Sequence, residues 1–144
     1  SLYLYNLKKL QDTSSTPNSQ RIDLKAVNAY VSGISAADWD INGETDALYV
    51  NTVSQNVKSG TLLRPEGNLH RVAVQNSSLA TFSPKSEKLF STNAPLFARP
   101  QLSLDSSGNR WIHLSTSGQT QQKDQQEKTG FTEGKIIGIP NIFR

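Results

Sequence analysis

The sequence of 144 residues predicts an all-β protein built from short antiparallel strands. Apolar and polar residues alternate over several short segments, which is the period of a half-buried strand. Ser, Thr, Asn and Gln are abundant, and the residues that favour helices have no helical periodicity. Long polar segments separate the strands, and they are more numerous than an immunoglobulin-like sandwich would have. We therefore expect about eight strands and no helix.

The first third of the chain is expected to hold four strands. Ser1–Leu7 is apolar on both faces, which is typical of a buried strand. A polar loop over 11–20 precedes Arg21–Val27, whose alternation predicts a half-exposed strand. Tyr30–Ile34 leads into an acidic segment, and Ala47–Val53 leaves it as the next strand.

The clearest hairpin is expected near the C-terminal end. Leu102–Leu104 and Arg110–Leu114 flank the turn sequence Asp105–Asn109, whose residues tolerate tight backbone conformations. Asn68–Val74 is expected to be an earlier strand, and Lys135–Ile139 the last one, ended by a proline. Residues 1–144 are interpreted as one domain. Its long exposed loops are expected at 54–67, 75–88 and 118–133.

The acidic segment 38–46 has the spacing of an EF-hand-type calcium loop. Calcium takes six to eight oxygen ligands, so alternate residues of a tight coil must point at one centre. Side-chain oxygens occupy loop positions one, three, five and nine, and a glycine that permits a sharp turn occupies position six. The predicted Ca²⁺ ligands are Asp38, Asp40, Asn42, the backbone carbonyl of Glu44, and Asp46, directly or through water.

The end of this loop departs from the EF-hand. Position twelve, which is a bidentate glutamate in an EF-hand, is Tyr49 within an apolar, β-branched segment. The loop is therefore expected to enter a strand, and its affinity to be lower than that of a complete loop. The alternative is an Asp- and Asn-rich turn without metal, since such residues satisfy their own backbone.

Composition excludes several classes of function. The net charge is only +3, Lys8-Lys9 is the one adjacent basic pair, and no aromatic–basic signature is present, so nucleic-acid binding is not expected. No apolar run approaches the length of a membrane span. Cysteine is absent, which excludes disulfides and thiolate metal sites. No signal peptide is recognisable within this chain.

The sequence does not predict an enzyme. Its two histidines, His70 and His113, lie in alternating strands and are interpreted as residues of the more exposed face. Trp39 and Trp111 are interpreted as core or near-core residues rather than ligand platforms. No nucleophile elbow, zinc-binding helix motif or phosphate-binding glycine loop is present.

The order of these segments resembles the C-terminal β-propeller of the PilY/PilC family, the type IV pilus tip-associated adhesins. Ala36–Val50 matches the family's acidic loop followed by a tyrosine-bearing strand, and Gly67–Val72 matches its Gly-Asn-x-x-Arg strand. Two departures are Asn51-Thr52, where the family usually has Gly-Asp, and an apparent insertion over Ser54–Glu66. The weaker matches are Asn93–Pro95, Arg110–Leu114, Thr116–Gly118 and Asp124.

The resemblance implies a calcium-binding β-propeller, extracellular at the cell surface or pilus tip, that acts in pilus assembly, retraction and adhesion. Its implied partners are pilins or minor pilins and a host-surface receptor. The same acidic loop occurs in integrin-type propeller repeats and in dockerins, but dockerins need paired loops with helices.

A blade takes about 40 to 45 residues, so this chain would supply three to four blades of a partial propeller. The other blades would come from another segment or a partner chain. We accordingly expect a neighbouring blade or subunit to cover Leu2, Leu4, Ile136 and Ile137. The alternative is that the first and last strands close against each other. The alternative function is a structural subunit of an extracellular filament that associates through its strand edges.

Overall fold

The computed structural model of the chain describes residues 1–5, 19–54, 57–58, 61–62, 65–74, 85–116 and 134–140. These residues form eleven strands and no helix, and every strand pairing is antiparallel. The all-β prediction is thus confirmed. The strands are β1 (Leu2–Tyr5), β2 (Ser19–Ile22), β3 (Ala29–Ala37), β4 (Ala47–Ser54), β5 (Val57–Lys58), β6 (Thr61–Leu62), β7 (Glu66–Ala73), β8 (Lys85–Thr92), β9 (Gln101–Leu104), β10 (Arg110–Ser115) and β11 (Ile136–Pro140).

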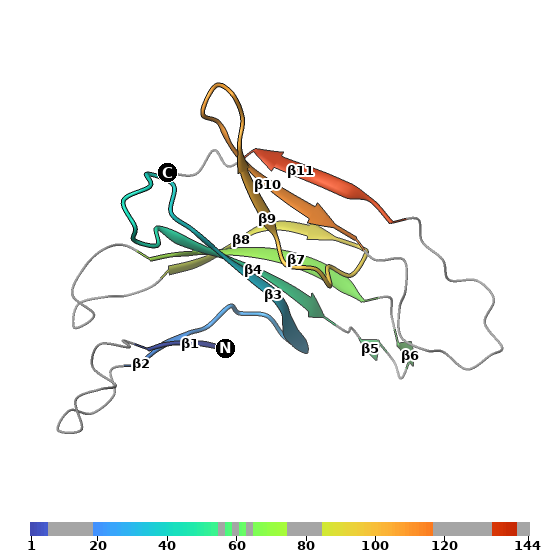
Figure 1. Cartoon of the computed structure of the whole chain (residues 1–144). Helices are drawn as coiled ribbons and strands as arrows, with labels where there is room; N and C mark the ends of the chain where they lie inside the picture. The colour runs from blue at the N-terminus through green and yellow to red at the C-terminus, as the bar shows by residue number, and fades with distance from the viewer. Residues whose placement is uncertain are drawn as a thin grey trace.

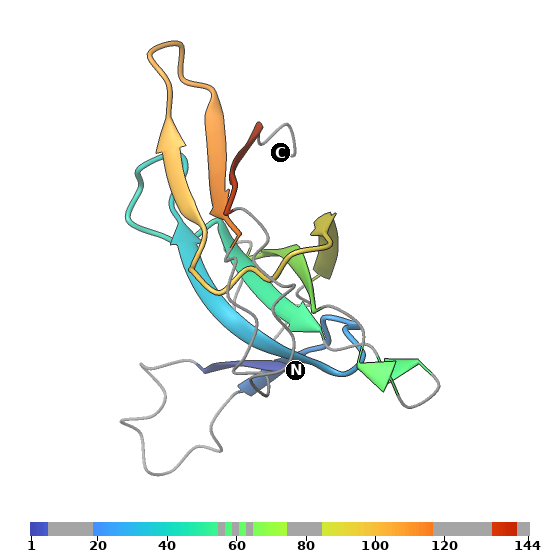
Figure 2. The same ribbon diagram turned by 90° about the vertical axis from the view of Figure 1, so that its right-hand side faces the viewer.

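The strands are stacked in layers (Figures 1 and 2). The middle layer is a four-stranded sheet in the order β3-β4-β7-β8. The β1-β2 hairpin lies against one face of this sheet, and the three-stranded sheet β11-β10-β9 lies against the other. The short β5-β6 ladder lies between β4 and β7 in the chain.

Strand β4 lies inside the middle sheet and contributes residues to two hydrophobic cores, one on each face of that sheet. Seven of its eight residues are buried, because it has a paired strand on each side and a packed layer on each face. Successive side chains of a strand point to opposite faces. Tyr49 therefore packs toward the three-stranded sheet, and Val50 packs toward the β1-β2 hairpin.

The segment 94–100 is laid directly on the middle sheet, and two glycines make room for it. A Cβ atom at Gly67 would lie 2.5 Å from the Leu96 Cγ, and one at Gly33 would lie 2.5 Å from the Arg99 Cα. The Asn51 side-chain amide also donates a hydrogen bond to the Ala98 carbonyl at 2.8 Å. These contacts set how closely the segment that leads into the three-stranded sheet approaches the middle sheet.

The strand predicted over Arg21–Val27 is wrong beyond Ile22. Strand β2 ends there, and Lys25 and Asn28 adopt left-handed backbone conformations with φ of 51° and 49°. The Asp23 carboxylate accepts a hydrogen bond from the Lys25 amide at 2.9 Å, which stabilises a turn instead of a strand. The apolar alternation is real, but it reflects burial of Ile22 and Leu24 beneath the middle sheet.

Two of the predicted exposed loops contain strands. The range 54–67 includes the β5-β6 ladder and the start of β7, and Ser54 and Gly67 are buried. The range 75–88 includes the start of β8. This strand carries charged residues, lies at the edge of the middle sheet and pairs with β7. Residues 75–84 and the whole of the predicted loop 118–133 lie outside the described residues.

The terminal strands pack partly on their own chain. Leu2 and Leu4 lie against the core that contains Val50, and Ile137 lies against the core that contains Tyr49. Ile136 stays 85% exposed, and Tyr3 is 55% exposed, so β1 is not buried on both faces. Within the part of the chain that the structure describes, no helix has the length and hydropathy of a membrane span.

The predicted hairpin is confirmed. β9 pairs with β10, with Leu104 opposite Arg110, and Asp105–Asn109 forms the turn. The Asp105 carbonyl accepts a hydrogen bond from the Gly108 amide at 2.9 Å, and Gly108 has the positive φ of 80° that this turn requires.

Candidate metal centre

The acidic loop 38–46 connects the adjacent strands β3 and β4 at one end of the middle sheet. The Asp46 amide donates to the Ala37 carbonyl at 2.7 Å and so closes the loop at its base. The Asp46 carbonyl accepts from the Val74 amide at 2.8 Å, which ties the base to the chain just after β7. Positive φ angles of 60° at Ile41 and 88° at Gly43 turn the backbone sharply inside the loop.

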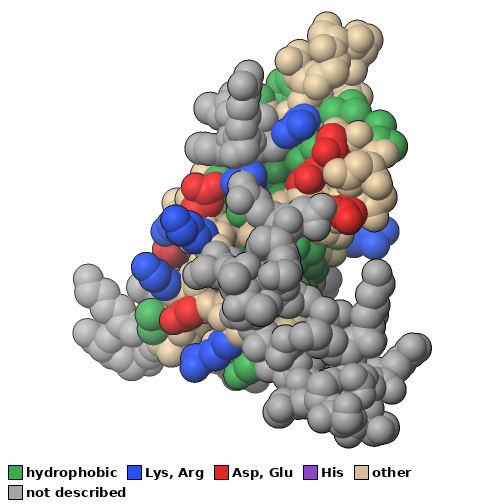
Figure 3. Space-filling model, turned by 90° about the vertical axis from the view of Figure 1, so that its left-hand side faces the viewer, with side chains coloured by type: hydrophobic (Ala, Val, Ile, Leu, Met, Phe, Trp, Pro, Cys, Tyr) green, Lys and Arg blue, Asp and Glu red, His purple; other side chains and the backbone are tan. Residues whose placement is uncertain are grey.

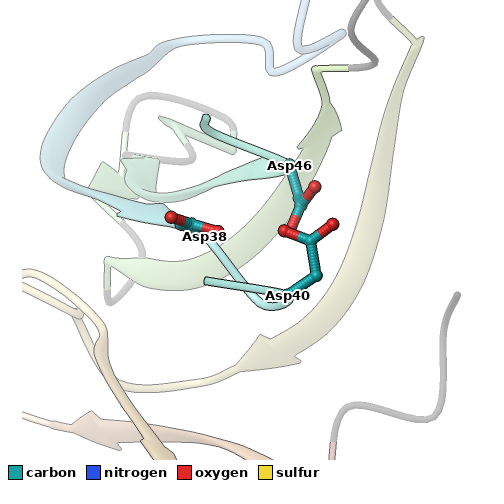
Figure 4. A group of neighbouring side chains, drawn as sticks. All are labelled: Asp38, Asp40 and Asp46. Atoms are coloured by element: carbon teal, nitrogen blue, oxygen red, sulfur yellow. The ribbon is translucent and has the colours of Figure 1, made fainter. Parts of the chain in front are cut away.

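This geometry gathers three carboxylates. Asp38, Asp40 and Asp46 each place one oxygen within 4.8 Å of the others, and Asp38 and Asp40 are exposed. Figure 4 shows the Asp40 and Asp46 carboxylates turned toward each other, with Asp38 beside them. Figure 3 shows this side of the molecule, where acidic side chains gather on its upper right-hand part.

Loop amides hold two of the carboxylates in position. The Asp38 carboxylate accepts hydrogen bonds from the Gly43 amide at 2.7 Å and the Asn42 amide at 3.1 Å. Desolvation acts to raise the pKa of Asp38, but these and further hydrogen bonds outweigh it, so this pKa lies below its usual value. The Asp46 carboxylate accepts from the Trp39 amide at 2.6 Å. These hydrogen bonds fix the positions of the Asp38 and Asp46 carboxylates and favour the ionised form of Asp38.

The other two predicted ligands lie in the same loop. The Asn42 side chain accepts a hydrogen bond from the Glu44 amide at 2.8 Å and donates one to the Asp40 carboxylate at 2.9 Å. These bonds orient the loop backbone around the carboxylates. The structure brings together the oxygens of Asp38, Asp40 and Asp46, and it places Asn42 and Glu44 beside them in the loop.

The donor chemistry fits a hard divalent cation. Calcium binds oxygen at 2.3–2.6 Å, so two oxygens on one ion lie within about 5 Å of each other. The three carboxylate oxygens meet this limit. Without a cation, like charges at such separations repel.

An aromatic and cationic cluster packs beside the loop. Trp39 lies between two of the carboxylate residues, and its indole ring meets the Tyr49 ring edge-on, with centroids 6.1 Å apart. The Arg110 guanidinium of β10 lies 5.3 Å from the Trp39 ring centroid. Tyr49, at loop position twelve, is fully buried and therefore serves the core. Periodicity could not reveal Arg110, because its contact with Trp39 joins two separate sheets.

The histidines do not join this site. The prediction that His70 lies on the more exposed face is wrong: it is 3% exposed, and its Nε2 lies 3.1 Å from the Thr52 hydroxyl. Burial and the nearby Lys88 ammonium lower the pKa of His70 below 6.5. His113 is half-buried in β10 of the three-stranded sheet, with its Nε2 2.9 Å from the Ser103 hydroxyl.

Comparison of the chain with protein-family models, curated proteins and solved structures finds no match in any of the three. The resemblance to the PilY/PilC family therefore rests on the residues of the sequence.

Proposed function

We propose that the chain is a calcium-binding β-propeller module of a type IV pilus-associated surface protein that acts in pilus assembly, retraction and adhesion. The observation that carries the proposal is the gathering of the Asp38, Asp40 and Asp46 carboxylates within 4.8 Å in the loop between β3 and β4. In this proposal Asn42 and the Glu44 carbonyl add oxygens to the set. The ion offsets the repulsion of the carboxylates and fixes the loop.

Two features support the propeller architecture. Strands β3, β4, β7 and β8 form an antiparallel meander of four strands, which is the composition of one blade. The sheet β9-β10-β11 packs face to face on it and supplies three strands of a neighbouring blade. The remaining blades come from another segment or a partner chain.

The proposed activity is binding rather than catalysis. A loop that lacks the position-twelve glutamate fills at about millimolar calcium, which is typical of extracellular modules. This supports a location at the cell surface or pilus tip. The proposed partners are pilins or minor pilins, together with a receptor on a host surface.

Calorimetric titration with calcium tests the metal site. The wild-type chain is expected to bind one ion, and Asp40→Ala to abolish the heat of binding. Glu44→Gln is the matched control, because it changes a loop residue whose proposed ligand is its backbone carbonyl. Absence of heat with wild type, or equal loss in both variants, would contradict the proposed ligand set.

A pelleting assay with purified type IV pili tests the proposed partner. The chain is expected to sediment with pili in calcium and to remain in the supernatant with a chelator. If calorimetry shows calcium binding while the chain never sediments with pili, the metal site stands and the pilus assignment fails.

One observation favours a second function, a filament subunit that associates through strand edges. The edge strand β3 carries no charged residue over Ala29–Ala37, whereas the opposite edge β8 carries Lys85, Glu87 and Lys88. Charges on an edge strand discourage pairing with another chain. Concentration-dependent assembly that Ile34→Lys prevents would support this function, and a monomer at all concentrations would exclude it.

A further inference from the structure

A pocket of about 340 Å³ with a mixed polar and apolar lining lies on the β1-β2 side of the middle sheet, away from the acidic loop. Its floor comes from the end of β4 and from β7 and β8, and the chain between β2 and β3 forms a wall. The polar side chains that line it are those of Lys25, Ser54, Glu66, Asn68, His70, Ser86 and Lys88, and Leu24, Ala26 and Val27 complete the lining. This volume is at the small end of the range for ligand sites.

The wall is held in an unusual conformation. Lys25 and Asn28 have φ of 51° and 49°, which non-glycine residues seldom adopt. Burial of the Leu24 side chain and a hydrogen bond from the Ser86 hydroxyl to the Asp23 carbonyl at 2.8 Å hold the segment to the sheet. Such strain persists only where the surroundings enforce it, and it concentrates at ligand sites.

One part of the pocket is cationic. Register places His70 of β7 opposite Lys88 of β8, and Lys25 contributes a second ammonium group from the wall. Among the described residues, the one ion pair is Arg71 with Glu87, so neither lysine has a carboxylate partner there. His70 is buried against the Thr52 hydroxyl, and both burial and Lys88 lower its pKa, which keeps the imidazole neutral.

The other part of the pocket presents groups that hydrogen-bond to hydroxyls. Glu66, Asn68 and His70 alternate along β7 and so share one face, over about 13 Å between the first and last Cα atoms. Ser54 lies opposite Glu66 in the register of β4 and β7. The lining thus carries one carboxylate acceptor at Glu66, the Lys88 ammonium near His70, and a second lysine, Lys25, on the wall.

We propose that this pocket binds a small carboxylate-bearing polyol of the acidic-monosaccharide class. Its carboxylate lies between Lys25 and Lys88, and its hydroxyls face Glu66, Asn68 and Ser54. The inference does not depend on calcium binding, because the acidic loop lies at the other end of β3 and β4.

Charge favours a carboxylate over a phosphate. Two lysines and one glutamate give the lining a net charge of +1 when His70 is neutral. One carboxylate balances this charge, whereas phosphate carries about −1.5 to −2 at neutral pH. No arginine lines the pocket, so this lining has no guanidinium group that could bind phosphate through bidentate hydrogen bonds.

Binding of glucuronate, glucose and inorganic phosphate to the folded chain tests the proposal by calorimetry and NMR. Glucuronate is expected to bind saturably and to perturb the His70 ring signals, with glucose and phosphate at least about tenfold weaker, a difference of about 1.4 kcal/mol. Equal binding of glucose would refute the role of the lysines. Equal binding of phosphate would reduce the site to a general anion site and overturn the proposal, as would no saturable binding of glucuronate at millimolar concentration.

Matched lysine variants test the geometry. Lys88→Gln is expected to weaken glucuronate binding about tenfold. Lys85→Gln removes the same charge from an exposed position of the same strand outside the pocket and is expected to leave binding unchanged. Equal effects of the two variants, or none from Lys88→Gln, would refute the site. Both lysines are exposed, so both variants retain the fold.

Discussion

The indole N–H of Trp39 donates a hydrogen bond to the hydroxyl of Tyr49 at 3.2 Å and thereby joins the acidic loop to the core of the middle sheet. Trp39 lies between Asp38 and Asp40 in the sequence, while Tyr49 is fully buried in β4. The loop that carries the carboxylates is therefore positioned by a core residue three positions beyond its end.

Removal of this hydrogen bond is expected to destabilise the fold. Tyr49→Phe should lower the free energy of unfolding by about 0.5–1.5 kcal/mol, the usual net value of such a bond, and Trp39→Phe should lower it further, because it also shrinks the ring that lies against Arg110. The double variant should lose less than the sum, because the two residues share one interaction. Urea unfolding of the four proteins measures the coupling, and strictly additive losses would show that the two residues act separately.

Calcium is expected to stabilise the folded chain. A ligand that binds only the native state at 100 times its Kd raises the free energy of unfolding by about 2.7 kcal/mol. Urea unfolding with excess calcium and with a chelator should show a shift of this order in wild type and in Glu44→Gln. Asp40→Ala should show no shift, and a shift as large as that of wild type would remove Asp40 from the ligand set.

Local chemistry explains which parts of the structure could be predicted. The turn at Asp105–Asn109 and the coil of 38–46 are made by residues close in sequence, so their spacing carried the information. Strand β8 could not be identified, because its strand state depends on pairing with β7 across a long connection. The exposure of His70 could not be predicted, because both faces of the middle sheet are covered by other layers. The alternation of apolar and polar residues within β7 does not reveal this.

Gly33 is expected to be intolerant of a side chain. A Cβ atom there would lie 2.5 Å from the Arg99 backbone, so Gly33→Ala must push the segment 94–100 away from the middle sheet and should cost about 1–3 kcal/mol. Gly138→Ala is the control within another strand, where the nearest atom would be at an ordinary 3.7 Å. Its effect should stay within about 0.5 kcal/mol. Thermal or urea unfolding compares them, and equal stability of the two variants would contradict the close approach.

Asp105 is expected to make stability depend on acid pH. Hydrogen bonds from the Asn109 side chain, the Trp111 indole and the Asn109 amide lower the pKa of Asp105 to about 2. Since its folded pKa is depressed, the stabilisation is complete above the unfolded value of 3.8 and is lost as pH falls toward 2. Wild type should therefore unfold at a higher midpoint than Asp105→Asn at pH 5, and this difference should shrink by pH 2. A difference that stays constant over this range would contradict the lowered pKa.

His70 is expected to oppose folding in mildly acidic solution. Burial and the Lys88 ammonium lower its pKa, while Glu66 on the same strand and Lys25 on the wall complete the charged groups around the pocket. As pH falls below about 6.5, the His70 imidazole is therefore protonated in the unfolded chain while it is still neutral in the folded chain. The free energy of unfolding consequently falls as pH drops from there toward the folded pKa of His70. Lys88→Gln should raise the pKa of His70 and flatten this pH dependence, whereas Lys85→Gln should leave both unchanged. NMR titration of the imidazole Cε1–H signals measures the pKa of His70 directly. The His113→Asn variant removes the signal of the other histidine and so assigns the one that belongs to His70. A His70 pKa at or above 6.5 in wild type would contradict the lowering by burial, and no rise in Lys88→Gln would remove the ammonium as a cause.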